Sequence, residues 1–320
     1  MTGAGRHAEA KVLAATLTLM AREMGRLGPP ESLWLPELSA SAVRESAQAV
    51  VSGQAAVLWV DDSHPAQGLA ICRTQPLETA LMGQGSLRLS GPWLVEPEPV
   101  VRYQSSRILA RKAKELAGRS EGRFLSIKTW HDPAVLRGLI DEGFQLAEIG
   151  ARLSGPLGER DPGGDLDRIA GVSVRRPRGY EFAGWLDGLG ELFFDGHLRH
   201  GPFLGPDFQN RLWREVASTD MRRGQPFLFL WQDRPEKAIG LAWGSLNGEA
   251  GTLAAIHVAE SRRGQGLGSF LARALLRRMA EMGARELTAE TASWNLPALR
   301  LYAGLGLRPV APLVALHLKI

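Results

Sequence analysis

The chain has 320 residues, of which 44% are hydrophobic and 22% charged, the balance of an ordinary globular protein that is long enough for two domains. The formal net charge of +4 is small, and no segment combines dense Lys and Arg with interleaved aromatic residues, so a nucleic-acid partner is not expected. Cys72 is the only cysteine, which excludes an internal disulfide and a multi-cysteine metal site and favours a reducing, cytoplasmic setting.

The N-terminal region predicts two helices and a strand. The first helix covers residues 8–27 and ends at Gly28, which two prolines follow. A second helix at residues 39–52 and a strand at residues 55–60 come next. The apolar stretch at residues 12–21 is too short to span a bilayer, so no membrane partner is expected. Residues 1–54 are therefore interpreted as an N-terminal helical extension.

The middle of the chain predicts an α/β unit. Residues 67–95 alternate strand-like segments with Gly and Pro turns, and then helices at 105–116 and 134–142 alternate with strands at 124–129 and 145–153. A linker at residues 155–168 is rich in Gly, Pro and charge, and a new strand opens at residues 172–174. The predicted division is thus a first domain at 55–154 and a second at 169–320.

The two domains resemble each other in one segment. A shift of 163 positions lays residues 131–144 over residues 294–307, with coincident Leu, Arg and Gly, and it places Asp132 opposite Asn295. It also places Leu139 opposite Tyr302, and the glycine-free residues 100–105 opposite a glycine-rich loop. The first domain is interpreted as a degenerate copy of the second. Two unrelated α/β segments that share a helix ending remain the alternative.

The glycine-rich loop lies between an apolar strand at 253–258 and a helical segment. It contains Gly264, Gly266 and Gly268. A helix start offers unpaired N–H groups and the positive end of the helix dipole, and glycines let a phosphate approach the main chain. The two-residue spacing fits neither the Walker loop, which also needs a Lys, nor the dinucleotide loop. Taken alone, the spacing is equally compatible with a turn used only for packing.

Residues further along the chain give the loop a specific interpretation. Arg263-x-x-Gly266-x-Gly268 is followed, about thirty residues later, by Asn295 and then by Tyr302 and a Gly-Leu ending. This order and spacing resemble the GNAT superfamily of acyl-CoA-dependent N-acetyltransferases. The resemblance implies an α/β (α+β) chain of two tandem GNAT-like domains, each a mixed, mostly antiparallel twisted sheet flanked by helices. It also implies that residues 55–154 lack the cofactor loop and that residues 169–320 form the catalytic domain.

The resemblance also implies acetyl-CoA as the cofactor and gives roles to residues. In the family, the loop amides hold the coenzyme pyrophosphate, and the preceding strand splays from its neighbour and pairs with the pantetheine arm. Asn295 would contact the coenzyme, and Tyr302 would protonate the departing thiolate. The expected cofactor-binding residues are Ile256, His257, Val258, Arg263, Gly264, Gln265, Gly266, Leu267, Gly268, Ser269, Asn295 and Tyr302.

The chemistry of these residue types is consistent with those roles, although each has a purely structural alternative. A phenol with a pKa near ~10 is protonated at neutral pH and can donate to a thiolate, yet Tyr302 on an amphipathic helix also fits a core aromatic. Asn295 before Leu-Pro is a good helix N-cap. Candidates for the base that deprotonates the amine are His257 and Glu290, with a water relay as a third possibility.

In the GNAT superfamily, the first strand and the helices that follow it cover the amine that accepts the acetyl group. The corresponding region here is residues 180–214, and it carries no specific motif. The candidate substrate residues are Phe194, His197, His200 and Phe203. His197 and His200 with Asp195 lack the helical i, i+4 spacing of a metal pair, so no metal is expected, and a plain surface loop is the alternative. Most of residues 70–320 also resemble TDP-fucosamine acetyltransferases, which act on nucleotide-linked amino sugars, whereas the N-terminal seventy or so residues have no counterpart there. Mycothiol synthase is likewise a tandem arrangement with one active half.

We therefore predict a cytoplasmic acetyl-CoA-dependent N-acetyltransferase. It is expected to transfer an acetyl group directly to a primary amine of a small molecule, with a nucleotide-linked amino sugar as one candidate, and to be a monomer or homodimer. Two alternatives remain open. One is a non-catalytic acyl-CoA sensor or interaction module, and the other is an acetyltransferase for protein or peptide amines.

Overall fold

The computed structural model describes residues 3–26, 40–64, 67–94, 98–157, 171–182, 184–185, 204, 206–233 and 236–320. The chain divides into two compact units. Unit 1 comprises Met1–Ile149, His200–Phe208 and Ala311–Ile320, and unit 2 comprises Gly150–Arg199 and Gln209–Val310. Among the described helices, none has the length and apolar character that crossing a bilayer requires.

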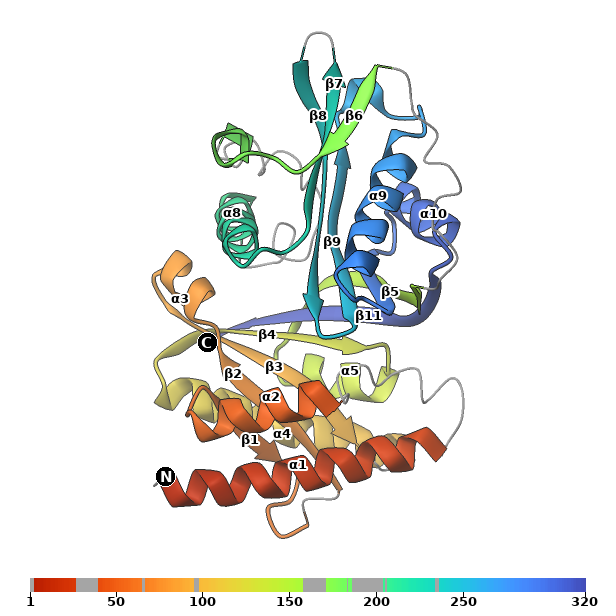
Figure 1. Cartoon of the computed structure of the whole chain (residues 1–320). Helices are drawn as coiled ribbons and strands as arrows, with labels where there is room; N and C mark the ends of the chain where they lie inside the picture. Colours follow the sequence, from red (N-terminus) through yellow and green to blue (C-terminus); the bar gives the residue numbers. More distant parts are fainter. Residues whose placement is uncertain are drawn as a thin grey trace. The chain divides into compact units, whose positions relative to one another are not determined.

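Unit 1 is built on a five-stranded mixed sheet with the order β1-β2-β3-β4-β11. Its strands are β1 (Ala55–Trp59), β2 (Gly68–Thr74), β3 (Gly85–Leu94), β4 (Gly122–Trp130) and β11 (Arg308–Lys319), the last strand of the chain. β3 and β4 are parallel, and the other pairs are antiparallel. β3 and β4 are parallel because α4 (Pro99–Arg119) provides the crossover between them (Figure 1).

Helices cover both faces of this sheet. On one face α1 (Gly3–Arg26) and α2 (Ala40–Val51) bury apolar side chains against the strands, namely Leu13, Leu17, Val43 and Val50 against Trp59, Leu69, Ile71 and Trp93. On the other face α4 and α5 (Pro133–Asp141) pack against Leu125 and Ile127. The predicted N-terminal extension is therefore an integral layer of unit 1. Its two helices precede β1, just as α8 (Pro206–Arg222) precedes the corresponding strand of unit 2.

Two predictions for unit 1 were wrong, namely the absence of a helix within residues 67–95 and the start of the helix that follows. α3 (Pro76–Met82) interrupts the stretch predicted as strands and turns, and its buried Glu78 accepts hydrogen bonds from Ser86 (2.9 Å) and Arg88 (2.6 Å). α4 begins at Pro99, six residues earlier than predicted, because a proline is well accommodated in the first turn of a helix. Residues 100–105, which the shift of 163 positions places opposite the glycine-rich loop, are consequently helical.

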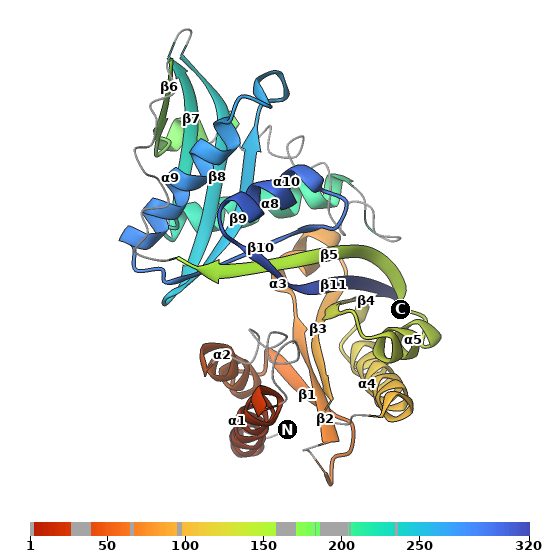
Figure 2. The same cartoon turned by 90° about the vertical axis from the view of Figure 1, so that its right-hand side faces the viewer.

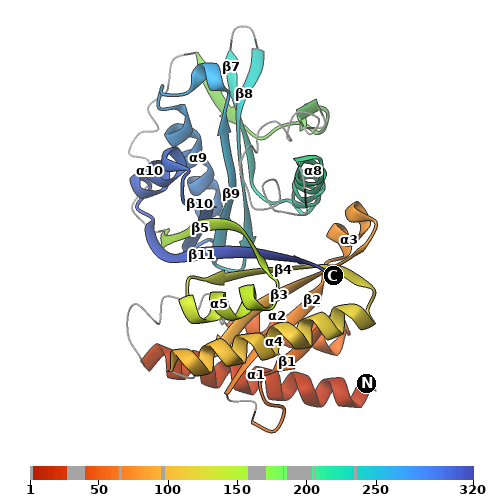
Figure 3. The same cartoon turned by 180° about the vertical axis from the view of Figure 1, so that it is seen from behind.

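Unit 2 has a six-stranded sheet with the order β5-β10-β9-β8-β7-β6. Its strands are β5 (Gln145–Pro156), β6 (Val172–Arg175), β7 (Phe227–Asp233), β8 (Glu236–Asn247), β9 (Ala250–Val258) and β10 (Glu286–Ala292), of which only β9 and β10 form a parallel pair. On one face lie α9 (Leu267–Glu281) and α10 (Leu296–Gly304); α8 lies on the other, over an aromatic layer with Phe227, Phe229 and Trp243 (Figures 1 and 3).

The two halves of the sequence exchange a strand. β5 comes from the first half, yet it pairs with β10 in unit 2 from Glu286↔Pro156 to Ala292↔Gly150. β11 comes from the second half, yet it pairs with β4 in unit 1 from Leu313↔Trp130 to Lys319↔Phe124 (Figure 2). The predicted linker therefore begins inside a strand, since Gly155 and Pro156 still belong to β5. The predicted division at residues 154 and 169 does not follow the packing of the chain.

The repeated segment has the same local structure in both halves. Asp132 caps α5 by accepting from the backbone N–H groups of Ala134 (2.9 Å) and Val135 (3.2 Å), and Asn295 caps α10 by accepting from that of Ala298 (3.3 Å). Leu139 is buried in the core of unit 1, as Tyr302 is in unit 2. The shift of 163 positions is thus correct for this helix and its cap.

Candidate active site

The parallel pair of unit 2 separates halfway along its length. β9 and β10 pair from Ala250↔Glu286 to Leu253↔Ala289, and the pairing stops there. β9 continues to Val258 with β8 as its partner on the other side. Among the described residues, the β10-facing edge of residues 254–258 has no strand partner. Its main-chain N–H and C=O groups are therefore available to an extended ligand that adds to the strand edge.

The glycine-rich loop follows β9 directly. Gly264 and Gly266 adopt left-handed conformations with φ of 77° and 76°, which favour glycine, and Gly266 is the N-cap of α9. A Cβ atom at Gly264 or Gly266 would meet nothing within 4 Å, and one at Gly268 would only reach Cγ2 of Val258 at 4.0 Å. The three glycines thus face open space, and a bulkier residue there would occupy that space.

The loop presents a run of unpaired amides. The N–H groups of Arg262 and Arg263 donate to Ala259 (2.8 Å) and Glu260 (3.1 Å), and that of Phe270 donates to Gly266 (3.0 Å). The amides between them, at residues 264–269, donate to no acceptor in the described part of the chain. The first turn of α9 carries no acidic residue. Together with the helix dipole, these amides form a site suited to a phosphate or pyrophosphate.

Two arginines connect the loop to the ends of strands. Arg263 donates through Nε to the carbonyl oxygen of Val258, the last residue of β9, at 3.1 Å. Arg262 is half-buried and donates to Gln232 on β7 (2.6 Å) and to Gln265 within the loop (3.1 Å). No sequence pattern indicates the Arg262–Gln232 contact, because its partners are 30 positions apart and carry no recognisable spacing.

Tyr302 lies on α10, and Asn295 lies directly before the first residue of that helix. Tyr302 is 6% exposed and belongs to the same packed cluster as Leu253 and Ala289, where the pairing of β9 and β10 stops. Burial raises the pKa of its phenol to about 12, so the hydroxyl keeps its proton. Asn295 caps α10 and also donates to Thr291 at 3.0 Å. Tyr302 is therefore a core aromatic residue and Asn295 a helix N-cap, which are the purely structural alternatives for these two residues. Their contacts with a coenzyme stay predictions.

The two candidate bases have different environments. His257 is in register with Leu241, Phe229 and Arg175 across four strands, on the face that α8 covers. Burial and the nearby Arg263 lower its pKa to about 4, so the imidazole is neutral at pH 7. Glu290 forms a two-pronged ion pair with Arg152 of β5, with distances of 2.8 Å to Nε and 2.6 Å to Nη2. Such a pairing stabilises the carboxylate and disfavours its role as a base.

The predicted substrate residues, Phe194, His197, His200 and Phe203, lie outside the described residues. The described strands β6 and β7 carry an arginine site that the sequence did not predict. Arg175 forms a bidentate ion pair with Glu181 (2.7 and 2.8 Å), and its guanidinium lies 4.0 Å from the ring centre of Trp231. Nothing in the spacing of the arginines at residues 175–178 indicates these partners.

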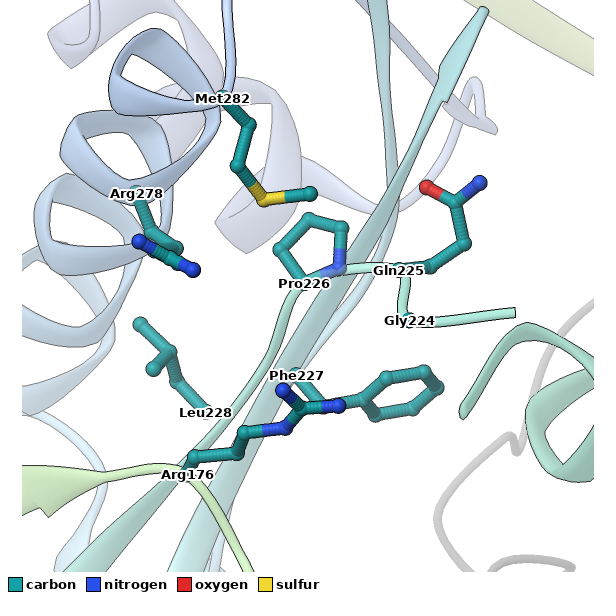
Figure 4. Close-up of a pocket in the computed structure, with 8 residues that line it drawn as sticks. All are labelled: Arg176, Gly224, Gln225, Pro226, Phe227, Leu228, Arg278 and Met282. Atoms are coloured by element: carbon teal, nitrogen blue, oxygen red, sulfur yellow. The ribbon is translucent and has the colours of Figure 1, made fainter. Parts of the chain in front are cut away.

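Unit 2 also contains a pocket that does not include the glycine-rich loop, and Figure 4 shows the residues that line it. Its lining includes Arg278 and Met282, from the last turn of α9 and just beyond it, and Arg176. Arg278 is eleven residues after Leu267, which corresponds to about 16 Å along the helix axis. The pocket is therefore separate from the amide site at the start of α9.

Comparison with known proteins shows which family this part of the chain is similar to. Residues 191–307 match the acetyltransferase (GNAT) family, a range that includes the loop, Asn295 and Tyr302. This part of the chain is thus similar to GNAT-type acetyltransferases. Over 241 residues it is 26% identical to a protein named mycothiol acetyltransferase from Clavibacter sepedonicus, covering 74% of this chain and 75% of that protein.

Solved structures share the fold. A GCN5-related N-acetyltransferase from Sphaerobacter thermophilus aligns with a TM-score of 0.56 at 14% identity, covering 78% of this chain and 76% of that one. A tandem GNAT protein from the clavulanic acid biosynthesis pathway aligns with a TM-score of 0.53 at 18% identity, covering 79% and 78%. The expected α/β fold with mixed sheets flanked by helices is confirmed. The closer resemblance to TDP-fucosamine acetyltransferases stays a prediction.

Proposed function

We propose that unit 2 binds acetyl-CoA and transfers its acetyl group directly to a primary amine of a small molecule. The observation that carries this proposal is the run of unpaired amides at residues 264–269, directly beside the unpaired edge of β9. The coenzyme pyrophosphate matches the amides, and the amide-containing pantetheine arm matches a strand edge. Residues Ile256 to Val258 and Arg263 to Ser269 would form this site, and Asn295 would lie beside it.

The residues of the chain have distinct tasks in such a reaction. When bound, the coenzyme supplies the acetyl thioester. The amine nitrogen forms a bond to the carbonyl carbon, the carbon–sulfur bond breaks, and one proton leaves the amine. Main-chain N–H groups of β9 can stabilise the carbonyl oxygen as negative charge develops on it, and the protonated Tyr302 hydroxyl can donate to the departing sulfur.

The proton released by the amine is assigned to a path through His257. Its neutral imidazole can accept a hydrogen bond, but with a pKa of about 4 it is too weak a base to hold the proton at pH 7, so it would orient a water molecule that passes the proton to solvent. Tyr302, having given its proton to the sulfur, would regain one from solvent, so that one proton in total moves from the amine to the thiol. Glu290 is the less suitable candidate because Arg152 occupies its carboxylate.

The acceptor is proposed to be an amine of an amino-sugar type. The resemblance of residues 70–320 to TDP-fucosamine acetyltransferases supports this class. Unit 1 has no glycine-rich loop before α4 and has Leu139 at the position of Tyr302, so we propose a single coenzyme per chain. We also propose that the protein acts in the cytoplasm as a monomer or homodimer.

The test has two stages. Calorimetry with acetyl-CoA should show one site per chain, and absence of binding would refute the proposal. A thiol-release screen with acetyl-CoA against amino sugars, nucleotide-linked amino sugars, polyamines and amino acids should then find a turned-over amine. Binding without release for any amine would favour the sensor alternative, and turnover restricted to peptide amines would favour a protein acetyltransferase.

A further inference from the structure

The contacts of Arg262 extend beyond the loop to which it belongs. Its Nη1 donates to Oε1 of Gln232 at 2.6 Å, and its Nε donates to Oε1 of Gln265 at 3.1 Å. Gln232 lies near the end of β7, where it pairs with Val172 of β6, whereas Gln265 stands between the two left-handed glycines. One half-buried guanidinium therefore connects the sheet to the middle of the glycine-rich loop.

A loop with this composition needs such a connection. Gly264 and Gly266 have access to far more backbone conformations than other residues, and the amides at 264–269 are held by no main-chain hydrogen bonds of their own in the described part of the chain. Converging amides bind an anion well only if they are already oriented, because ordering them on binding costs affinity. Hydrogen bonds from a charged donor are the stronger kind and can supply this order.

The second loop arginine has a different task. Arg263 donates to the carbonyl oxygen of Val258, so it fixes the point at which β9 becomes the loop. It makes no contact with β7 among the described residues. Among the hydrogen bonds in the described part of the chain, that of Arg262 to Gln232 links the glycine segment to β7, on the far side of β8.

We infer that Arg262 is a positioning residue that, through Gln232 and Gln265, holds the loop amides in the orientation that binds the coenzyme. The inference rests on the proposed function, since it concerns the same site. Gln232 becomes a determinant of coenzyme affinity although it lies on β7, outside the loop. The clamp, by which we mean Arg262 with its acceptors Gln232 and Gln265, acts on coenzyme binding. A saturating concentration of coenzyme should therefore restore turnover in a variant that lacks it.

The decisive variant is Gln232→Leu, which removes the strand side of the clamp and leaves every loop residue unchanged. We expect the Kd for acetyl-CoA to rise about tenfold while kcat at saturating coenzyme stays within about twofold of the wild type. Gln232→Glu keeps an acceptor oxygen for Arg262 and should retain the wild-type Kd. An unchanged Kd in Gln232→Leu, or a fall in kcat without a change in Kd, would overturn the inference.

Arg262→Lys separates positioning from simple attraction of charge. A lysine keeps the positive charge but cannot present donors to Gln232 and Gln265 in the fixed geometry of a guanidinium. We expect the Lys variant to bind acetyl-CoA as weakly as Arg262→Gln, and wild-type affinity in it would contradict the clamp. Because the clamp acts as one unit, adding Gln232→Leu to Arg262→Gln should cause little further loss, whereas fully additive losses would contradict it.

Arg278→Gln is the matched control, because it removes an arginine from the other end of the helix that the loop precedes. Arg278 pairs with Glu281 at 3.0 Å on the surface, and its loss should leave the Kd for acetyl-CoA unchanged.

Thermal melting of each variant shows whether it is folded. If Gln232→Leu does not fold, the comparison of Arg262→Lys with Arg262→Gln decides. The two failures are distinct: a wild-type protein that binds no acetyl-CoA refutes the proposed function, whereas a wild type that binds together with an unaffected Gln232→Leu refutes only the clamp.

Discussion

At the scale of single residues, burial decides the protonation of the groups that matter most. Tyr302 has its pKa raised to about 12 by burial, and His257 has its pKa lowered to about 4 by burial and by Arg263. Both side chains are thus uncharged between about pH 5 and 11. A reaction that depends on them should follow the ionisation of the acceptor amine rather than of the protein in this range.

Replacing Tyr302 with Phe tests the proton donor. The change removes only the hydroxyl, so we expect kcat to fall roughly ten- to a thousandfold while the Kd for acetyl-CoA changes little. Steady-state kinetics and calorimetry measure the two quantities. Tyr103→Phe in unit 1, where the hydroxyl donates to Asp141 at 2.8 Å, is the matched control and should keep full turnover. Unchanged kcat in Tyr302→Phe would disprove the assigned role.

His317 provides a prediction about stability and pH. It is fully buried on β11, and burial, with a contribution from Arg88, lowers its pKa to about 4. The unfolded chain, with a pKa near 6.5, binds more protons between these values, so the free energy of unfolding should decrease as the pH falls from about 6.5 to 4. The part due to His317 is on the order of 2–3 kcal/mol.

Urea unfolding of the wild type and of His317→Gln between pH 7 and pH 4.5 measures this contribution. The variant should lose stability less steeply with falling pH than the wild type does, whatever its absolute stability. Identical slopes would show that His317 is not a source of the pH dependence.

At the scale of elements, the glycine-rich loop combines a local conformation with an open space. Gly266 needs a positive φ and faces open space, and both requirements were implied by the sequence pattern. The existence of α3 was not, because it depends on the buried contacts of Glu78 with Ser86 and Arg88. The start of α4 at Pro99 is a local signal that the predicted helix omitted. Local patterns therefore predicted the loop better than they predicted the helices around it.

Gly266→Val tests the loop. The side chain would fill the space in front of the amides, so acetyl-CoA binding should be lost in calorimetry. Gly248→Val is the matched control, because Gly248 also has a positive φ (61°) and open surroundings but lies in the turn between β8 and β9. Both variants should lose a similar amount of stability from backbone strain, and only the first should lose binding. Retained binding in Gly266→Val would exclude the loop as the coenzyme site.

At the scale of the whole molecule, strand exchange makes the halves of the sequence interdependent. β11 buries Leu313, Val314 and Leu316 in unit 1, and β5 covers the edge of β10 in unit 2. A sequence division at the Gly- and Pro-rich linker leaves each half with a strand that belongs to the other unit. Neither half then contains all the strands of a sheet.

The fragments 1–168 and 169–320 test this interdependence. Alone, each lacks one strand of its own sheet and exposes apolar side chains, so we expect neither to show a cooperative thermal transition. Produced together, they should form a 1:1 complex that binds acetyl-CoA, as size-exclusion chromatography and calorimetry can show. A stable, coenzyme-binding fragment 169–320 by itself would show that β5 is dispensable.

The sequence by itself determined the fold class, the glycine-rich loop at the start of α9, the cap and helix around Asn295 and Tyr302, and the repeat of that helix in the first half. Each depends on neighbouring residues, whose spacing directly reflects backbone conformation. Only the tertiary structure decided the exchange of β5 and β11, the pairing of Glu290 with Arg152, and the link from Arg262 to Gln232. These join residues far apart in the chain, and because many partners satisfy the same hydrogen bond, only packing selects one.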